Sequence, residues 1–385
     1  MTADNPRVSG GVSKSVPRAA GLAACLALAL SLGAQEYRFQ YLGAEQGLSN
    51  LAVKNLYQDR QGFLWVSTED GIFRYDGQRF QAFGSEEGLP SSDGVAFAEL
   101  ADGSLVVGGE IGLFRLAGNR FAKISLPGSN SVSWAGGVKS DSRGRTYVAT
   151  ESGLVVLAGI AGSKELSIRA IATAPGVSNA ATSGLAVDRD AVWYGCGEQL
   201  CRLNGERVHV FGAQAGLPAS RWMAIGRAAN GEFWVRGRGV GAAVMAPRTE
   251  SFHLRETPLP ASGVSGIPGV DFDGFLLFPS PDGLVIRRHD DWWKVGEAAG
   301  LRGVVYAALQ DREGSIWLGL AGRGLVRWSG YRSWESYGST SGLGSDLVYQ
   351  VLPQADGTVW AGTESGLVRG TRQGDRYVWK KQESV

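Results

Sequence analysis

Few side chains in this sequence are of the types that catalyse reactions or hold metals. Among 385 residues there are three His and three Cys, so a metal site built from these ligands is not expected. His209, His253 and His289 lie in or beside strand-like segments far apart in the chain, where we expect them not to converge. There is no Gly-x-Ser-x-Gly elbow, phosphate-binding loop or His-Glu-x-x-His motif. We therefore predict that the chain is not an enzyme and has no cofactor and no metal.

Two cysteines are close enough in sequence to react with each other. Cys196 and Cys201 flank four residues, Gly197 to Leu200, that are typical of a hairpin turn. On facing strands their Cα atoms can come within the ~4.4–6.8 Å that a disulfide requires. In an exported protein we expect either this disulfide or two small buried thiols.

Four other residues could bind a ligand, because they break the pattern of a repeated position. The position of Ala52 becomes Asp93, Trp134 and Arg221 in later copies of the same motif, and Trp222 adjoins the last of them. An acid, a base and two indoles at matching positions could line one opening and hold a sugar-like or peptide ligand. The alternative is that these side chains only pack against their own loops or face solvent.

These residues are positioned by a unit that recurs along the chain. Residues 59–75, which begin Asp-Arg-Gln-Gly-Phe-Leu-Trp, return in similar form at 311–327 and 356–369. The turn glycine of the unit falls at Gly62, Gly103, Gly144, Gly231, Gly274, Gly314 and Gly357. One further copy, around Asp188, lacks the glycine, so the 295 residues from first to last hold seven steps of about 42 residues. Eight copies with this period are typical of propeller blades.

Each copy is predicted to form four strands. In the first copy the strands are expected at 51–58, 63–68, 72–75 and 79–83, with Asp-Gly turns that are strong hairpin signals. A four-stranded sheet of this size cannot bury both faces alone, so the copies must stack around an axis. The sequence therefore predicts an all-β fold, a propeller of seven or eight four-stranded antiparallel blades.

One large aromatic residue recurs in the second strand of these copies. It is Trp65, Trp193, Trp234, Trp317 and Trp360. We interpret it as packing between blades and not as ligand binding.

The segment Gly108-Gly109-Glu110 resembles a cyclase signature, but its position within the repeat indicates another role. Gly109 aligns with Thr68 and Glu110 with Glu69, so these residues are predicted to form an ordinary hairpin.

An aromatic segment stands before the first complete copy. Residues Tyr37–Tyr41 are similar to the segments that close later copies, at Arg79–Phe83, Arg207–Phe211 and Tyr331–Tyr337. A closing strand placed ahead of the first copy predicts pairing with strands from the other end of the chain. Such pairing would close the ring and remove a free sheet edge.

The beginning of the chain is typical of an export signal. Lys14 and Arg18 precede an apolar run over 19–32, and small residues follow, which predicts a signal peptide or an uncleaved anchor over 1–34. Cys25 in a lipoprotein-like box is interpreted as a chance match. An exported location follows. The net charge of +1 gives no field that would attract nucleic acid.

The motif from Gly47 to Gly77 resembles the two-component regulator propeller repeat, and the resemblance extends over nearly all of the chain after the leader. It implies a periplasmic sensor region, often two seven-bladed rings, at the N-terminus of membrane-bound hybrid histidine kinases or diguanylate cyclases. In that family an immunoglobulin-like domain and a membrane helix usually follow.

This sequence departs from that plan, since it has eight repeats, no second membrane span and no kinase or cyclase region. We expect one propeller domain over 35–385, either truncated or free-standing. Its eight repeats form either a seven-bladed ring plus the first blade of another, or a closed eight-bladed ring.

The expected function is ligand sensing in a signal-transduction receptor. The expected partners are a small-molecule or glycan ligand and a C-terminal signalling domain or membrane partner; a homodimer stays open. The alternatives are a scaffold that binds proteins and a carbohydrate-active propeller enzyme, since a fold does not fix function.

Overall fold

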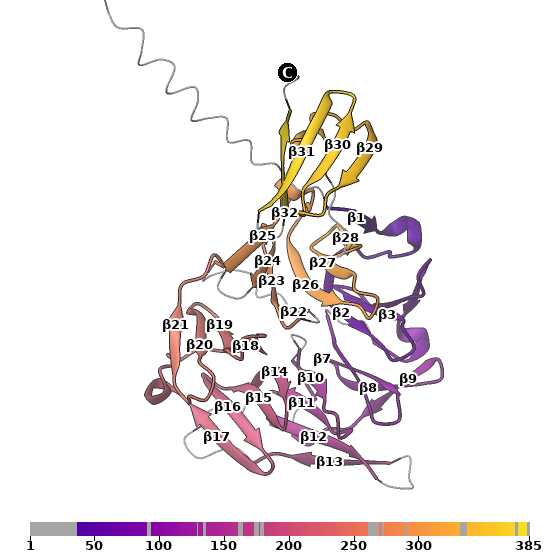
Figure 1. Ribbon diagram of the computed structural model, residues 1–385. Helices are drawn as coiled ribbons and strands as arrows, with labels where there is room; N and C mark the ends of the chain where they lie inside the picture. The colour runs from indigo at the N-terminus through magenta and orange to yellow at the C-terminus, as the bar shows by residue number, and fades with distance from the viewer. Residues whose placement is uncertain are drawn as a thin grey trace, which may run out of the picture. The chain divides into compact units, whose positions relative to one another are not determined.

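The computed structural model describes residues 37–90, 94–128, 130–133, 136–160, 165–172, 177, 181–260, 269–271, 273–288, 291–331, 337–373 and 376–382. Its strands form eight four-stranded sheets, which confirms the predicted all-β propeller (Figure 1). No helix among these residues is long and apolar enough to cross a membrane. The leader predicted over 1–34 lies outside the described residues.

The chain divides into two compact units. Residues 36–336 form one unit, which holds seven of the sheets, and residues 337–385 belong to the other, which holds the eighth. The sequence analysis expected all eight repeats in one domain over 35–385, whereas the structure separates the last repeat from the first seven. Of the two arrangements left open, the structure has a seven-bladed ring and one further blade.

The first four blades each use four consecutive strands. They are β2 (Val53–Gln58), β3 (Leu64–Thr68), β4 (Ile72–Tyr75) and β5 (Phe80–Phe83); β6 (Ala96–Glu99), β7 (Leu105–Gly109), β8 (Gly112–Ala117) and β9 (Arg120–Ile124); β10 (Val138–Ser140), β11 (Thr146–Thr150), β12 (Gly153–Gly159) and β13 (Leu166–Ala170); and β14 (Thr182–Asp188), β15 (Ala191–Cys196), β16 (Gln199–Asn204) and β17 (Arg207–Phe211).

The remaining blades of the ring follow the same order, except that the last borrows a strand. They are β18 (Trp222–Arg227), β19 (Phe233–Gly237), β20 (Gly241–Met245) and β21 (Phe252–Arg255); β22 (Gly269–Val270), β23 (Leu276–Ser280), β24 (Gly283–Arg288) and β25 (Asp291–Val295); and β26 (Val305–Gln310), β27 (Ile316–Leu320) and β28 (Gly324–Trp328) with β1 (Phe39–Leu42).

The second strand of each blade in the ring is its most buried part. In β3, β7, β11, β19, β23 and β27 every residue is buried. A strand covered on both faces reads as a continuous apolar run, which is how the sequence shows it. The predicted hairpin at Gly109–Glu110 is also confirmed, because β7 and β8 pair antiparallel around it.

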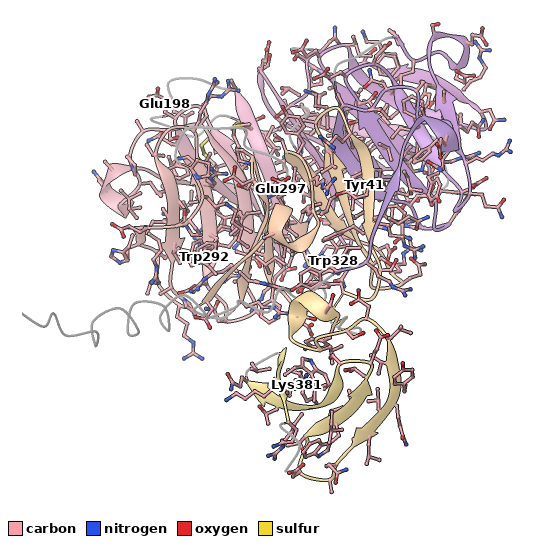
Figure 2. The ribbon with its side chains drawn as sticks, turned by 90° about the horizontal axis from the view of Figure 1, so that it is seen from above. Tyr41, Glu198, Trp292, Glu297, Trp328 and Lys381 are labelled. Carbon is pink, nitrogen blue, oxygen red and sulfur yellow. A yellow bond between two sulfur atoms is a disulfide. The ribbon has the colours of Figure 1, made fainter. Side chains whose placement is uncertain are left out.

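The ring is closed by the aromatic segment ahead of the first blade. Strand β1 pairs antiparallel with β28, with Phe39 opposite Trp328 and Tyr41 opposite Val326, which confirms the predicted closure (Figure 2). The ring of Tyr37 lies edge-on to Trp328 with centroids 4.6 Å apart. One part of the prediction was wrong: β1 takes the fourth-strand position of the seventh blade that Tyr331–Tyr337 was expected to fill, and residues 332–336 lie outside the described residues.

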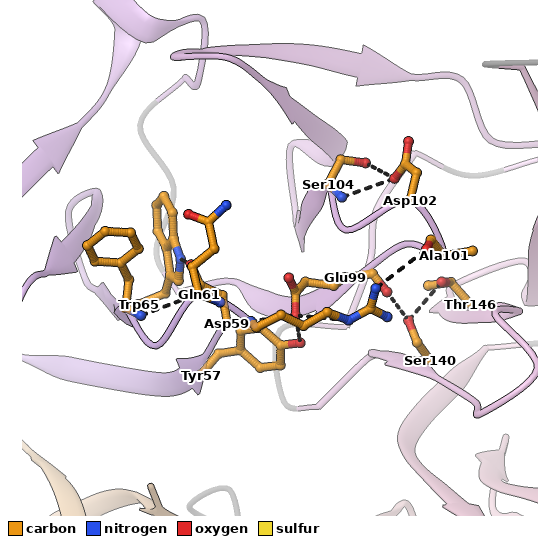
Figure 3. Close-up of polar contacts among 12 residues, drawn as sticks. Tyr57, Asp59, Gln61, Trp65, Glu99, Ala101, Asp102, Ser104, Ser140 and Thr146 are labelled. Carbon is orange, nitrogen blue, oxygen red and sulfur yellow. Dashed lines mark hydrogen bonds and ion pairs between the residues drawn. The ribbon is translucent and has the colours of Figure 1, made fainter. Parts of the chain in front are cut away.

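The repeated tryptophan packs between blades, as predicted. Trp65 belongs to one apolar cluster with Phe97 of the second blade, and Trp193 to another with Phe233 of the fifth. In the first blade the indole Nε1 donates a hydrogen bond of 2.7 Å to Asp59, the residue that opens the adjacent turn (Figure 3). Neighbouring sheets therefore interlock through one aromatic position. Its indole has a polar partner in the first blade, whereas Nε1 of Trp193 has none among the described residues.

A short helical turn leads from one blade toward the next at five places. These turns are η1 (Ala44–Gln46), η2 (Ser85–Glu87), η3 (Ala213–Ala215), η4 (Glu297–Ala299) and η5 (Ser339–Ser341). Each ends at a glycine with a left-handed backbone, which glycine adopts without steric cost. The next residue is a buried leucine in every case: Leu48, Leu89, Leu217, Leu301 and Leu343.

The eighth sheet has the same blade pattern but a smaller core. Its strands are β29 (Val348–Pro353), β30 (Val359–Thr363), β31 (Gly366–Gln373) and β32 (Arg376–Lys381). Val348 is 39% and Val351 57% exposed, whereas Val53 and Leu56 at the matching positions of the first blade are 0% and 8% exposed. The strand that a neighbouring blade covers in the ring therefore presents apolar side chains on its surface here.

Candidate ligand site in the central channel

A channel runs along the inner strands of the ring. Its volume is about 540 Å³, and all seven innermost strands contribute to its wall. The lining residues are Asn55, Leu56 and Tyr57; Ala96 and Phe97; Gly136, Val138, Lys139 and Ser140; Leu185, Ala186, Val187 and Asp188; Met223, Ile225, Gly226, Arg227 and Phe233; Gly269 and Val270; and Ala308 and Leu309. Ligand sites are typically concave, mostly apolar and about 300–1,000 Å³ in volume, and the channel fits this description.

Three charged side chains are among the described residues of this wall. Asp188 of β14 and Arg227 of β18 form a two-pronged ion pair, with Nε to Oδ1 at 2.9 Å and Nη2 to Oδ2 at 2.6 Å. The same guanidinium donates to the carbonyl of Gly231 at 2.6 Å. Bidentate pairs of this kind are strong and directional. The pair joins the fourth and fifth blades and leaves Lys139 of β10 as the uncompensated charge of the wall.

Lys139 is open to the channel but enclosed by the ring. Its side chain is solvent-exposed, and desolvation by the surrounding protein lowers the pKa of its ammonium below the usual 10.5. Within the part of the chain that the structure describes, the ammonium makes no hydrogen bond or ion pair. A lysine desolvated without a counter-ion is common at functional sites and rare elsewhere.

A polar network supports the wall beside Lys139 (Figure 3). The hydroxyl of Ser140 donates to the carbonyl of Glu99 at 2.6 Å and lies 2.8 Å from the hydroxyl of Thr146. The Glu99 carboxylate accepts hydrogen bonds from the Tyr57 hydroxyl at 3.1 Å and from the backbone of Arg60 at 3.0 Å. Burial, followed by the charge and the hydrogen bond of Glu99, raises the pKa of Tyr57. The network fixes three neighbouring blades relative to one another.

Of the four residues proposed from sequence to line an opening, the structure describes Arg221 and Trp222. Asp93 and Trp134 lie outside these residues. Arg221 is exposed, and its carbonyl accepts a hydrogen bond from the backbone of Arg238 at 3.1 Å. Trp222 is 0% exposed and packs in a core cluster with Trp193, so its indole is covered by protein and is not a lining residue.

The two cysteines of the fourth blade form a disulfide. Cys196 ends β15 and Cys201 lies in β16, with Cα atoms 5.8 Å apart, and Glu198 lies between them at the turn (Figure 2). Of the two alternatives left open by the sequence, the structure therefore has the bridge. Both cysteines are buried, so the bond staples a hairpin of the ring.

Histidines do not gather at a catalytic site in the described part of the chain. His209 lies in β17 and His253 in β21, which are the outer strands of two blades, and His289 lies outside the described residues. No group of three or more His, Cys, Asp or Glu side chains among the described residues is arranged to hold a metal.

Sequence reasoning missed the channel lysine. In register, Lys139 pairs with Tyr147 as Tyr57 pairs with Trp65, so the two residues hold the same position of the innermost strand. The residues proposed from sequence lie at or beside the entry of that strand, at the position of Ala52, whereas Lys139 lies in its middle. A lysine where other copies carry Tyr57, Ala98 or Leu309 is a visible signal once the innermost strand is known to line a channel.

Comparison with known proteins identifies the repeat. The family model described as Two component regulator propeller matches residues 47–70. This segment runs from the left-handed glycine after η1 through β2 and β3. The first repeat is a two component regulator propeller repeat. No curated protein matches the chain in sequence.

Solved structures share the fold of this chain. The chain resembles the extracellular domains of two proteins from B. thetaiotaomicron that are assigned as hybrid two component systems. One is 20% identical with a TM-score of 0.61 over 86% of this chain and 53% of that one. The other is 18% identical with a TM-score of 0.60 over 91% and 48%. This chain thus spans about half the length of the extracellular domains that it matches.

An enzyme also shares the propeller fold. Virginiamycin B lyase from Staphylococcus aureus is 12% identical, with a TM-score of 0.57 over 76% of this chain and 99% of the lyase. Because all three identities are low, these likenesses establish the fold and not an activity.

Proposed function

We propose that this chain is an extracytoplasmic ligand-sensing propeller module of a bacterial signal-transduction receptor of the two-component or diguanylate cyclase type. The observation that carries the proposal is the two component regulator propeller match at 47–70. The likeness of the ring to extracellular domains of hybrid two component systems supports it. So does the channel, to which every blade contributes.

The geometry offers a simple way to register a ligand. The innermost strands of all seven blades of the ring line the same space, so a ligand bound there can contact more than one blade. A ligand that binds one arrangement of the blades better than another shifts the population toward that arrangement. A signalling domain coupled to the ring would then report the shift. The free-energy change between the two arrangements cannot exceed the difference in the ligand's binding free energy for them.

The proposal is tested by thermal unfolding of the purified chain against a panel of glycans, organic acids and peptides. A ligand specific for the folded ring raises the midpoint of unfolding in a concentration-dependent way. The expected result is a small set of related compounds that raise it. If no compound raises the unfolding midpoint and a pull-down finds a stable protein partner, the sensor proposal is wrong and a protein-binding scaffold takes its place.

Protein binding is a second candidate, and the eighth sheet favours it. Tyr349 is 71% and Leu352 53% exposed on β29, next to Val348 and Val351. The matching residues of the ring lie against the next blade, so the surface complementary to this strand is another propeller blade. Light scattering of the chain and of a Tyr349→Ser, Val351→Ser variant tests this, because loss of association only in the variant assigns the interface to β29.

A further inference from the structure

Among its described side chains, the channel has one charge without a counter-charge and few polar groups that are still free to bond a ligand. Asp188 and Arg227 neutralise each other, so the described wall carries one net positive charge, on Lys139. The polar side chains beside them are already used. Asn55 donates to the carbonyl of Val95 at 2.9 Å and accepts from the backbone of the next residue at 2.8 Å. Ser140 is held by the network described above.

This pattern is unfavourable for a neutral sugar. A buried sugar needs several hydrogen-bond donors and acceptors, because each hydroxyl group that is left unpaired costs free energy. The described side chains of the wall supply instead apolar surface, including Met223, Ile225 and Val270, together with one ammonium group. An ammonium is compact, offers three donors and binds an anionic group as a point charge.

We propose that the channel binds a small organic anion with an apolar body, such as a monocarboxylate, and that the anionic group pairs with Lys139. This inference rests on the proposed sensing function and names the ligand class for it. Of the small-molecule or glycan ligand expected from sequence, it selects the small molecule. The volume of about 540 Å³ is sufficient for a body of several carbon atoms.

The desolvated state of the lysine supports the assignment. Desolvation disfavours the charged form of Lys139, and an opposite charge placed beside it favours that form again. Binding of an anion would therefore restore the pKa toward its usual value. It follows that affinity for the anion falls as the pH rises through the pKa of the free lysine, because the unprotonated amine offers no charge.

The test uses residue-resolved chemical labelling of the full chain. Reductive methylation is followed by mass spectrometry of peptides, with and without phenylacetate or hexanoate, and with their neutral amides as matched probes. The expected result is that the two anions slow methylation of Lys139 but not of Lys123, an exposed lysine on the outer strand β9, and that the amides do not. Equal protection by anion and amide, or none by either anion, overturns the proposal.

Variants give a second, independent readout by calorimetry. Lys139→Met keeps the length of the side chain without its charge and should weaken binding of the anions about tenfold or more, the effect of losing a charged hydrogen bond. Lys139→Arg should keep most of the affinity, and Lys123→Met should leave it unchanged. Unaltered affinity in folded Lys139→Met contradicts the assignment.

The outcomes separate this inference from the proposed function. If other ligands raise the unfolding midpoint while the anions neither bind nor protect Lys139, the sensor proposal stands and the ligand class is wrong. If the anions bind at Lys139 but produce no response in a receptor that carries this ring, the site is right and the sensing role fails.

Discussion

In several blades, an aspartate accepts the hydrogen bonds that hold the turn after the innermost strand. In the first blade, Asp59 accepts hydrogen bonds from the backbone of Gln61 and Phe63 through one carboxylate oxygen and from Trp65 through the other. In the seventh blade, Asp311 bonds its tryptophan in the same way, at 2.6 Å. One residue thus closes a turn, as aspartate commonly does, and also satisfies a buried indole.

Replacing this aspartate should destabilise the ring. Asp59→Ala removes the acceptor of a buried indole N–H and of two turn amides, which should lower the free energy of unfolding by about 1–3 kcal/mol. Urea unfolding measures the change. Asp76→Ala is the matched control, since Asp76 accepts from two turn amides but lies exposed. Equal losses in the two variants would show that the tryptophan bond adds nothing.

Lys139 makes stability depend on pH with a defined sign. Its pKa is lowered in the folded chain from the usual 10.5, so its protonated form opposes folding. The cost is complete below the folded pKa, shrinks as pH rises, and is gone above 10.5. The stability of the wild type should therefore rise relative to Lys139→Met as pH approaches 10.5, measured by urea unfolding at several pH values. A difference that does not change with pH would contradict this.

At the level of residues, the sequence predicted what repeats and missed what occurs once. The tryptophan position was found because five copies share it, and its packing role followed from sheet stacking. The arginine opposite it also recurs, as Arg74 lies over Trp65 and Arg327 over Trp317. Lys139 is a single departure in the middle of a strand, and only the arrangement of seven strands around one axis gives it meaning.

At the level of elements, the glycine that ends the helical turn η3 carries two constraints. Gly216 has φ of +83°, and a Cβ atom there would lie 2.1 Å from the carbonyl oxygen of Phe252 on the neighbouring blade. Backbone strain and a backbone clash therefore both oppose any side chain. The buried leucine that follows can reach the core only if this turn is intact.

Substitution of this glycine should be costly for both reasons. Gly216→Ala is expected to lower the free energy of unfolding by about 3 kcal/mol or more, since left-handed strain alone costs about 1–2 kcal/mol. Gly205→Ala is the control, because Gly205 also has positive φ but open space around it. Thermal unfolding of both variants separates the clash from the strain. If the two variants lose similar amounts of stability, the close approach of Gly216 to the backbone of Phe252 makes no contribution.

Most strands were predictable because their signals are local. The four strands expected in the first repeat match β2 to β5 within two residues, since apolar runs and Asp-Gly turns mark their ends. The fourth strand of the seventh blade was assigned to the wrong segment. Residues 37–41 and 331–337 have similar aromatic sequences, and local similarity does not say which of them pairs with β28.

At the level of the whole molecule, the antiparallel pair of β1 and β28 joins the two ends of the ring, and Trp317 of the seventh blade also packs in one cluster with residues of the first. Tyr37 and Phe39 pack against Trp328 with ring centroids 4.6 and 5.6 Å apart. The contacts join residues nearly 300 positions apart in the chain. Loss of this strand pair would leave β28 as a free sheet edge. It would also expose the facing surfaces of the first and seventh blades.

Removing the aromatic seal should therefore affect all seven blades together. A Tyr37→Ala, Phe39→Ala variant is expected to lose about 3 kcal/mol of unfolding free energy, as for truncation of large core side chains, in a single shifted transition. Tyr377→Ala, in the eighth sheet, should leave that transition in place. Denaturation followed by tryptophan fluorescence and circular dichroism checks both. Separate transitions for the first and seventh blades would contradict a ring that unfolds as one unit.

The propeller could be predicted from the sequence, and the number of blades in the ring could not. The period of about 42 residues and the closing segment at 37–41 indicate a ring. Eight repeats are compatible with a seven-bladed ring plus one further blade and equally with a closed eight-bladed ring. The choice depends on the angle between neighbouring sheets, which is set by packing at every blade interface and leaves no mark on any one repeat.

Strand β1 leaves the ribosome before any blade is made, yet its partner β28 is among the last parts of the ring to be synthesised. Pairing must wait for some 280 intervening residues, and contacts so far apart in sequence form slowly. Until then an aromatic strand with no partner has to be kept from joining other sheets, and the waiting time is set by the rate of chain elongation.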